Sequence, residues 1–255
     1  MDSNLTVLMP LTRFSNRAEN YASYRPSYPE AVVPFFEKDL GLKTGQRIAD
    51  IGSGTGLLSE LLLKKGYHVI CIEPNMEMRK AGEKRLSHYP GFSSRGRTAE
   101  STGLKSHSID LITVAQAFHW MEPIATKKEF ARILKPGGHI VLGWNIRQKN
   151  TTFLEEYENL KINFGIDYNT TNRINEETIR KFFNPGSTEI VSFPNIQWLD
   201  FDSLKGQLLS SSYIPLPGHP SYDEMISTLV SLFVRHNENG LVKMEYETKL
   251  FWNSF

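Results

Sequence analysis

From about residue 28 to residue 142 the chain alternates between short, mostly apolar runs and longer amphipathic stretches. The short runs predict buried strands; they cover residues 47–51, 68–73, 109–114 and 139–143, and a weaker strand is expected at about 93–98. The amphipathic stretches predict helices; they cover residues 29–41, 57–65, 75–87 and 123–134. Strands that alternate with helices in this way form a parallel sheet with right-handed crossovers. The pattern therefore predicts an α/β core over about residues 28–144.

The rest of the chain has a less regular pattern. Residues 150–172 are polar and aromatic and only partly helical in pattern, while 188–193 and 242–252 look like strands. Further helices are expected at 176–183, 203–209 and 222–236. No internal repeat or low-complexity linker divides the chain, so we expect one domain, 1–255, with additions on the substrate side at about 145–172 and 202–240.

The most informative segment is the turn that follows the first predicted strand. The strand ends near Asp50, and three alternate glycines then lead into a helix; the turn residues are Gly52, Ser53, Gly54, Thr55 and Gly56. A strand, a glycine turn and a helix bring bare backbone close to a nucleoside cofactor. Nicotinamide-binding turns read G-x-G-x-x-G/A, whereas the sixth position here is the large Leu57. A tight connection without a ligand is the alternative reading of this turn.

The G-x-G-x-G spacing with Asp50 before it resembles the first motif of class I S-adenosylmethionine-dependent methyltransferases. The resemblance implies that the glycine turn lies against the amino-acid part of the cofactor and that Asp50 organises this end of the site. Glu73 stands 21 residues beyond Gly52, close to the spacing of about 20 at which an acid reaches the ribose hydroxyls. Read alone, Glu73 is a solvated charge at a strand end.

Later segments resemble the small-molecule methyltransferases of the trans-aconitate methyltransferase-like group. They are Thr98–Glu100, Ala115–Trp120 and Leu134–Gly138. The resemblance extends over about Tyr21 to Trp144 and implies a Rossmann-like, doubly wound, mostly parallel seven-stranded sheet with an antiparallel C-terminal strand and added helices. It also implies further cofactor-binding residues: Pro74, Ala99, Glu100, Gln116 and Ala117. Among these, Pro74 would lie against the adenine ring, and Ala99 and Glu100 belong to the segment near the adenine amino group.

The N-terminal segment is unusually aromatic and resembles the Y-x-x-Y-R-P-x-Y-P lead-in of the same group. The resemblance implies a lid over the cofactor at residues 14–28. Arg25 would pair with the cofactor carboxylate, and Tyr21 or Tyr24 would face the sulfonium through cation–π attraction. The other reading is an aromatic helix that packs onto the sheet.

Methyl transfer from a sulfonium is an in-line displacement in which the protein mainly aligns the partners. His119 follows the fourth strand and is the candidate general base, although it could equally orient or pack beside Trp120. Several aromatic residues are candidates for the substrate pocket and could equally be core: Tyr24, Trp120, Trp144, Tyr157 and Tyr213, together with His219.

Composition restricts the partners. The net charge is +1, so no global charge attracts nucleic acid or an anionic membrane. Cys71 is the single cysteine, which fits a reducing, cytoplasmic location. No apolar run approaches the ~20 residues of a membrane span, the start of the chain does not resemble a signal peptide, and no ligand spacing suggests a metal.

These features predict a methyltransferase that uses S-adenosylmethionine and acts on a small molecule, at a carboxylate or hydroxyl oxygen. Two alternatives stay open, an NAD(P)-dependent oxidoreductase and a protein that binds S-adenosylmethionine without catalysis. The oligomeric state is not readable from the sequence.

Overall fold

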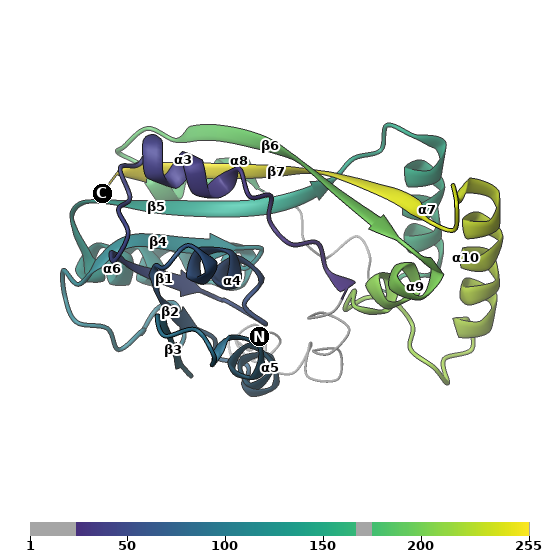
Figure 1. Ribbon diagram of the computed structural model, residues 1–255, viewed down its shortest axis with the longest axis horizontal. Helices are drawn as coiled ribbons and strands as arrows, with labels where there is room; N and C mark the ends of the chain where they lie inside the picture. The colour runs from purple at the N-terminus through teal and green to yellow at the C-terminus, as the bar shows by residue number, and fades with distance from the viewer. Residues whose placement is uncertain (1–23, 167–174, 255) are drawn as a thin grey trace, which may run out of the picture.

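The computed structural model describes residues 24–166 and 175–254. The described residues form a seven-stranded sheet in the order β3-β2-β1-β4-β5-β7-β6. The strands are β1 (Arg47–Ile51), β2 (His68–Ile72), β3 (Phe92–Arg95), β4 (Ile109–Ala115), β5 (Leu134–Arg147), β6 (Glu189–Leu199) and β7 (Val242–Ser254). Neighbouring strands from β3 to β5 are parallel, whereas β7 is antiparallel to both β5 and β6. The expected mostly parallel sheet with an antiparallel C-terminal strand is confirmed (Figure 1).

Helices cover both faces of this sheet. On one face α3 (Val32–Lys38) and α4 (Leu57–Lys64) pack in one hydrophobic cluster, joined by Leu86 at the end of α5 (Met76–Leu86). On the other face α6 (Pro123–Ile133) and α8 (Glu176–Phe183) pack in a second cluster. The arrangement is doubly wound, as expected, and it leaves the carboxyl ends of β1, β2 and β4 free to carry a site.

The predicted helix starts follow from capping. The side chain of Asn75 accepts hydrogen bonds from the backbone N–H groups of Glu77 and Met78, as its position before a helix predicts. Pro123 begins α6, and the Glu122 carboxylate caps it by accepting from the next two free N–H groups. A glutamate in that position is not a strong sequence signal, so the Glu122 cap was missed.

The long strands are where the predicted boundaries were wrong. Strand β5 has 14 residues and β6 has 11, although the sequence pattern gave only 139–143 and 188–193. The extra residues of β6 and those at the carboxyl end of β5 pair with β7, for example Arg147 with Tyr246. At the other end of β5, Leu134 pairs with Ile109 of β4. Because pairing with a distant strand extends these elements, their own hydrophobic pattern did not show it.

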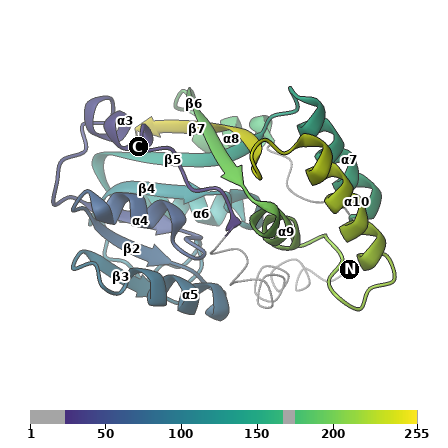
Figure 2. The same cartoon turned by 45° about the vertical axis from the view of Figure 1, so that its right-hand side comes forward.

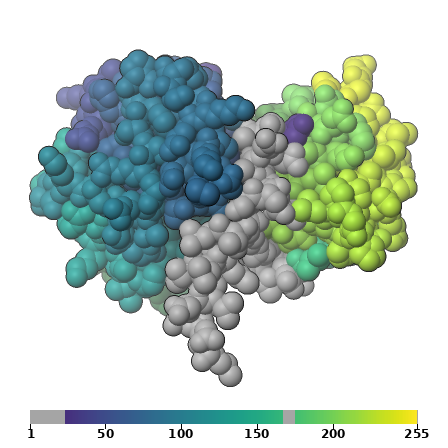
Figure 3. All heavy atoms as spheres, turned by 90° about the horizontal axis from the view of Figure 1, so that it is seen from below, coloured from purple at the N-terminus to yellow at the C-terminus, as the bar shows by residue number. Residues whose placement is uncertain are grey.

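The extended strand ends carry a second group of helices, α7 (Thr152–Phe164), α9 (Phe201–Leu209) and α10 (Tyr222–His236). We call these helices and the strand ends on which they pack the added lobe; it has its own hydrophobic cluster. Figure 2 shows the lobe beyond the ends of β6 and β7, and Figure 3 shows it in green and yellow opposite the blue and teal core. Helix α7 is regular over 13 residues, more than its sequence pattern suggested.

Within residues 24–166 and 175–254, no helix is both long enough and apolar enough to cross a lipid bilayer.

Candidate functional site

The glycine turn joins β1 to α4, and its backbone is left-handed at each glycine. The φ angles are +67° at Gly52, +56° at Gly54 and +82° at Gly56. A Cβ on Gly52 would lie 2.5 Å from the Cβ of Ala117, and one on Gly56 would lie 2.4 Å from Leu86 Cδ1. The packing of the chain itself therefore requires glycine at these two positions, in addition to any ligand.

Asp50 lies beneath the turn and is almost completely buried. Its carboxylate accepts a hydrogen bond of 2.5 Å from Ser59 Oγ and one of 2.9 Å from Thr113 Oγ1. Burial raises the pKa of Asp50 to about 6, although both hydroxyl groups act in the opposite direction. Asp50 thus connects β1 to α4 and β4, which fixes the base of the turn from inside the protein.

Glu73 follows β2 and braces the turn from the other side. Its Oε2 accepts from the backbone N–H of Gly54 at 2.8 Å, and its Oε1 accepts from the backbone N–H of Asn75 at 2.8 Å. Burial raises the pKa of this carboxyl, and the two backbone N–H groups oppose the shift. A carboxylate has about four acceptor positions, so Glu73 keeps room for two further donors. Pro74, beside it, is half-buried.

The loop between β3 and β4 contains the predicted adenine residues. Ala99 is buried and Glu100 is half-buried. Glu100 Oε1 accepts from the backbone N–H of Glu122 at 3.0 Å, so the loop is attached to the start of α6. This contact occupies part of the Glu100 carboxylate, which the resemblance had assigned to the adenine alone.

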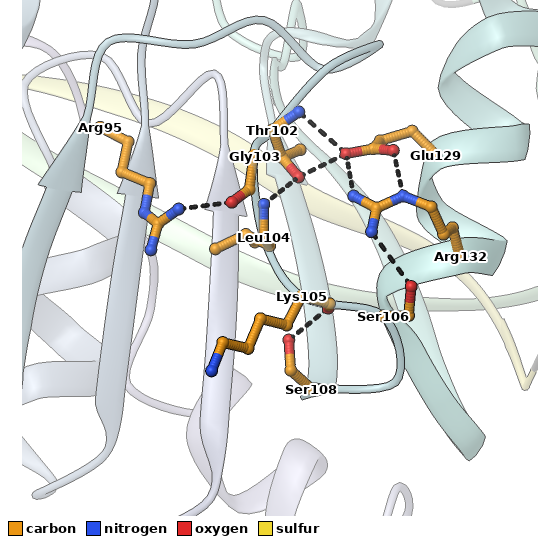
Figure 4. A network of polar contacts seen from close by, with 9 residues as sticks. All are labelled: Arg95, Thr102, Gly103, Leu104, Lys105, Ser106, Ser108, Glu129 and Arg132. Carbon is orange, nitrogen blue, oxygen red and sulfur yellow. Dashed lines mark hydrogen bonds and ion pairs between the residues drawn. The ribbon is translucent and has the colours of Figure 1, made fainter.

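A polar network that the sequence did not reveal holds the same loop (Figure 4). Glu129 of α6 accepts from the backbone N–H of Thr102 at 2.9 Å and from its hydroxyl at 2.6 Å. Arg132 donates to both oxygens of Glu129, at 2.7 and 2.8 Å. Glu129 is therefore a positioning residue for the loop. In the sequence, Glu129 could be recognised only as an acidic residue on a helix face whose other residues are buried.

Gln116 and Ala117 directly follow β4. Gln116 has a φ of +59°, and its backbone N–H donates to the Gly143 carbonyl at 2.8 Å. Its side-chain Nε2 donates to the Asn145 carbonyl at 3.3 Å. Ala117 is the residue that a side chain on Gly52 would strike. Ala117 thus lies against the turn, whereas Gln116 contacts β5.

His119 lies next along the chain, in a short 3₁₀ helix (Phe118–Trp120). The His119 side chain is exposed, and its ring centroid is 4.8 Å from that of Trp120. Phe118 anchors the helix, because it is buried and packs edge-on against Phe182. A role of His119 as a base stays a prediction, as does contact between Trp120 and a substrate.

The described part of the N-terminal segment rests on the added lobe. The carbonyl of Tyr24 accepts from Gln197 and Gln207 at 3.2 and 3.3 Å. The Arg25 guanidinium donates to the Ser210 carbonyl at 3.3 Å and to Ser211 Oγ at 3.4 Å. These contacts lie at the end of α9, and pairing of Arg25 with the cofactor carboxylate stays a prediction. Tyr21 lies outside the described residues.

The other aromatic candidates separate into core and lobe. Trp144 is buried and packs edge-on against Phe251, 5.8 Å between centroids, inside the core cluster. Tyr157 is buried in the added lobe, where Tyr213 is half-buried. His219 is exposed, and its Nδ1 accepts from the backbone N–H of Ser221 at 3.2 Å. Of these, Trp144 fits the core reading, and Tyr213 is still a candidate for the pocket.

Two further observations delimit the site. Among the described residues, no group of three or more His, Cys, Asp or Glu side chains could hold a metal ion. A surface cavity of about 440 Å³ lies between α3 and the strands β6 and β7, lined by Phe35, Phe193 and Trp252 among others. None of the predicted site residues lines this cavity, so we assign it no part in the site.

Comparison with known proteins identifies the core. Residues 49–142 match the methyltransferase domain family. An uncharacterized methyltransferase of Mycobacterium tuberculosis is 34% identical over 143 residues, which are 56% of each chain; the match thus spans about half the length of that relative.

Solved structures extend the likeness to the whole fold. A putative type II methyltransferase from Anaeromyxobacter dehalogenans superposes with a TM-score of 0.69 at 20% identity, over 91% of this chain and 98% of that one. The phosphoethanolamine N-methyltransferase 2 of Haemonchus contortus, solved in complex with S-adenosyl-L-methionine, has a TM-score of 0.58 at 15% identity. That match covers 96% of this chain and 58% of the other. The added lobe lies within the parts compared.

Proposed function

From the premise that residues 49–142 form a class I S-adenosylmethionine-dependent methyltransferase domain, we propose that the protein transfers a methyl group from S-adenosylmethionine to a small molecule. The acceptor atom in this proposal is a carboxylate or hydroxyl oxygen. A cytoplasmic location and membership of the trans-aconitate methyltransferase-like group stay predictions from the sequence.

The observation that carries the proposal is the geometry of Glu73. Its carboxylate is held by one backbone N–H of the glycine turn and one of the next helix, both at 2.8 Å. The two remaining acceptor positions match the two ribose hydroxyls of a nucleoside cofactor, which each donate one hydrogen bond. The residues present therefore fit the group, and the Thr55 hydroxyl, buried and without a partner, is one more polar atom in the turn.

In this proposal the residues around the turn bind and align. Glu73 holds the ribose, Gln116 and Ala117 limit the position of the cofactor beside Gly52, and the loop with Ala99 faces the adenine. S-adenosylmethionine supplies an electrophilic methyl carbon whose bond to sulfur breaks, with the electron pair left on sulfur, as the bond to the acceptor oxygen forms. Alignment of this kind can supply an effective molarity of about 10⁵ M or more.

The proton balance decides whether His119 is needed. A hydroxyl acceptor loses its proton during transfer, and the exposed imidazole of His119 can accept it near neutral pH. A carboxylate acceptor is already ionised and needs no base. Turnover of His119→Ala at saturating cofactor separates the two cases: a large loss indicates a hydroxyl acceptor, and unchanged turnover removes the catalytic role of His119.

Calorimetry tests the cofactor. We expect S-adenosylmethionine and S-adenosylhomocysteine to bind and NAD(P) not to bind. Glu73→Gln should weaken binding about tenfold or more, because an amide cannot accept from both hydroxyls as a carboxylate does. Glu77→Gln, on the partly exposed first turn of α5, is the matched control and should leave affinity unchanged. Binding of nicotinamide nucleotides alone contradicts the proposal and favours the oxidoreductase.

Turnover separates an enzyme from a binding protein. The assay measures transfer of labelled methyl groups into a library of carboxylic acids, phenols, alcohols and amines. Label in a carboxylic ester or an ether supports the proposed oxygen acceptor. Tight cofactor binding without transfer into any member supports the non-catalytic alternative.

A further inference from the structure

Three cationic side chains meet in the interior of the added lobe. We call Arg25, Arg147 and Lys161 the cationic cluster. Lys161 of α7 is only 5% exposed, and its Nζ lies 5.1 Å from the ring centroid of Tyr213 and 5.9 Å from that of Tyr157. Arg147, at the end of β5, has its Cζ 5.2 Å from the same Tyr157 ring. Two cations therefore lie near one buried aromatic side chain.

Among the described residues, Lys161 has no carboxylate partner. Glu158 forms ion pairs with Arg147 and with Lys149. Within residues 24–166 and 175–254, no carboxylate lies within ion-pair distance of Lys161, and the Nε of Arg147 is buried without a hydrogen-bond partner. Burial, then Arg147 and then Arg25 lower the pKa of Lys161 well below its ordinary value. A buried cation without a carboxylate is costly unless something else compensates it.

Strand β5 connects the cluster to the residues that follow β4. Gln116, directly after β4, donates through Nε2 to the carbonyl of Asn145 on β5. Arg147 lies two residues further along that strand, so the backbones of Asn145 and Arg147 are about 7 Å apart at a rise of about 3.3 Å per residue.

Arg25 joins the cluster from the N-terminal segment. Its guanidinium donates to Ser210 and Ser211. Its positive charge adds to the effect of burial in lowering the pKa of Lys161. Burial raises the pKa of Tyr213, and the charge of Arg25 acts in the opposite direction. Arginine and lysine together with tyrosine hydroxyls are the groups that bind oxyanions in proteins.

We propose that the cationic cluster binds an oxyanion group of the methyl acceptor, a carboxylate or a phosphate, and so selects negatively charged small molecules. This inference rests on the proposed function, because it assigns the acceptor of that same site. The bound oxyanion supplies the negative charge that Lys161 lacks among the described residues.

Calorimetry on the full chain tests the proposal, with and without saturating S-adenosylhomocysteine. The probes are citrate and fumarate as carboxylates, glycerol 3-phosphate as a phosphomonoester, and glycerol and fumaramide as neutral analogues. We expect at least one oxyanion to bind and the neutral probes not to bind. The carboxylate and phosphate arms distinguish the two sources of the anion.

Variants assign the binding to the cluster. Lys161→Met keeps the length of the side chain, removes its charge and should weaken oxyanion binding about tenfold or more. It should also raise the unfolding temperature, by about 2 °C or more, because a buried uncompensated cation is removed. Arg147→Lys keeps a positive charge to pair with Glu158 but loses the planar guanidinium, so it should also weaken oxyanion binding. This variant tests the site if Lys161→Met does not fold. Lys128→Met, on the exposed face of α6, is the control and should change neither property.

The results separate the two proposals. If S-adenosylhomocysteine binds but no oxyanion does, or if Lys161→Met and Arg147→Lys bind the oxyanion as tightly as the unchanged protein, the cluster proposal is wrong and the proposed function stands. If S-adenosylhomocysteine does not bind, the proposed function is wrong, and the titrations without it still decide whether the cluster takes an anion.

Discussion

The glycine-turn region and the added lobe bury charge in opposite ways. Around the turn the buried charged groups are the acids Asp50 and Glu73, and each accepts two hydrogen bonds from nearby hydroxyl or backbone N–H groups. In the lobe the buried Lys161 lies near two aromatic rings and forms no ion pair with a described carboxylate. The first region is preorganised for a ligand that donates hydrogen bonds, whereas the second is suited to a ligand that brings negative charge.

The two regions also differ in how they are assembled. Asp50 lies on β1, and Glu73, 23 residues later, directly follows the adjacent parallel strand β2. The cationic cluster combines residues 25, 147 and 161, which meet only because β5 extends past the core and α7 turns back on it. A binding site for a common cofactor can thus be local, while selectivity for the acceptor is built from distant parts of the chain.

The largest effect on stability is expected when Glu158, the acid that pairs with Arg147 of the cationic cluster, is neutralised. Glu158→Gln leaves Arg147 buried without a carboxylate, which should lower the free energy of unfolding by about 3–5 kcal/mol. Glu156→Gln on the same helix removes a more exposed acid that pairs with Arg235 and His236 and should cost about 0–1 kcal/mol. Urea denaturation measures both, and equal costs would show that the lobe does not depend on this acid.

In the glycine-turn region, Gly52→Ala should be the most damaging small change. The new Cβ meets Ala117 and the residue must keep a φ of +67°, so strain and overpacking together should cost about 2–4 kcal/mol. Gly137→Ala has a similar φ of +77° and no atom within 4 Å, so only the strain of about 1–2 kcal/mol remains. Binding of S-adenosylhomocysteine should fall in the first variant alone; loss in both would contradict a local effect.

The pKa of Asp50 predicts how stability changes with pH. The folded-state value of about 6 exceeds the ordinary 3.8, so the folded state holds a proton that the unfolded state releases. Its contribution to stability is therefore complete below pH 4 and is lost as the pH rises through 6, by about 3 kcal/mol in all. Asp50→Asn should remove this part of the slope in urea denaturation at several pH values, whereas Asp202→Asn, on an exposed position of α9, should not.

The smallest effect concerns the loop between β3 and β4. Glu129→Gln weakens the hydrogen bonds to Thr102 and the ion pair with Arg132, for an expected loss of about 1 kcal/mol. Faster amide hydrogen exchange in residues 99–104 should accompany this loss. Glu83→Gln, which removes an exposed ion pair with Arg79, is the control. Unchanged exchange in Glu129→Gln would mean that the loop is held by other contacts.

Much of the core could be predicted because its signals are local. The apolar runs gave β1, β2 and β4, Asn75 and Pro123 marked helix starts, and the spacing from Gly52 to Glu73 gave two residues that the structure brings to one turn. Each of these signals depends on residues close in sequence or on a regular period. The Glu129 brace could not be found in this way, because its partner Thr102 is 27 residues away and in a loop.

The sequence by itself determined the alternation of strands and helices in the core, the glycine turn and the class of cofactor to expect, since backbone conformation and hydrophobic period are local properties. Only the tertiary structure decided the lengths of β5 and β6, the position of Trp144 in the core, and the direction of Arg25 toward α9. It also brought Arg25, Arg147 and Lys161 together. Charge balance inside a protein depends on which distant groups share a volume from which water is excluded, and no pattern along the chain records that.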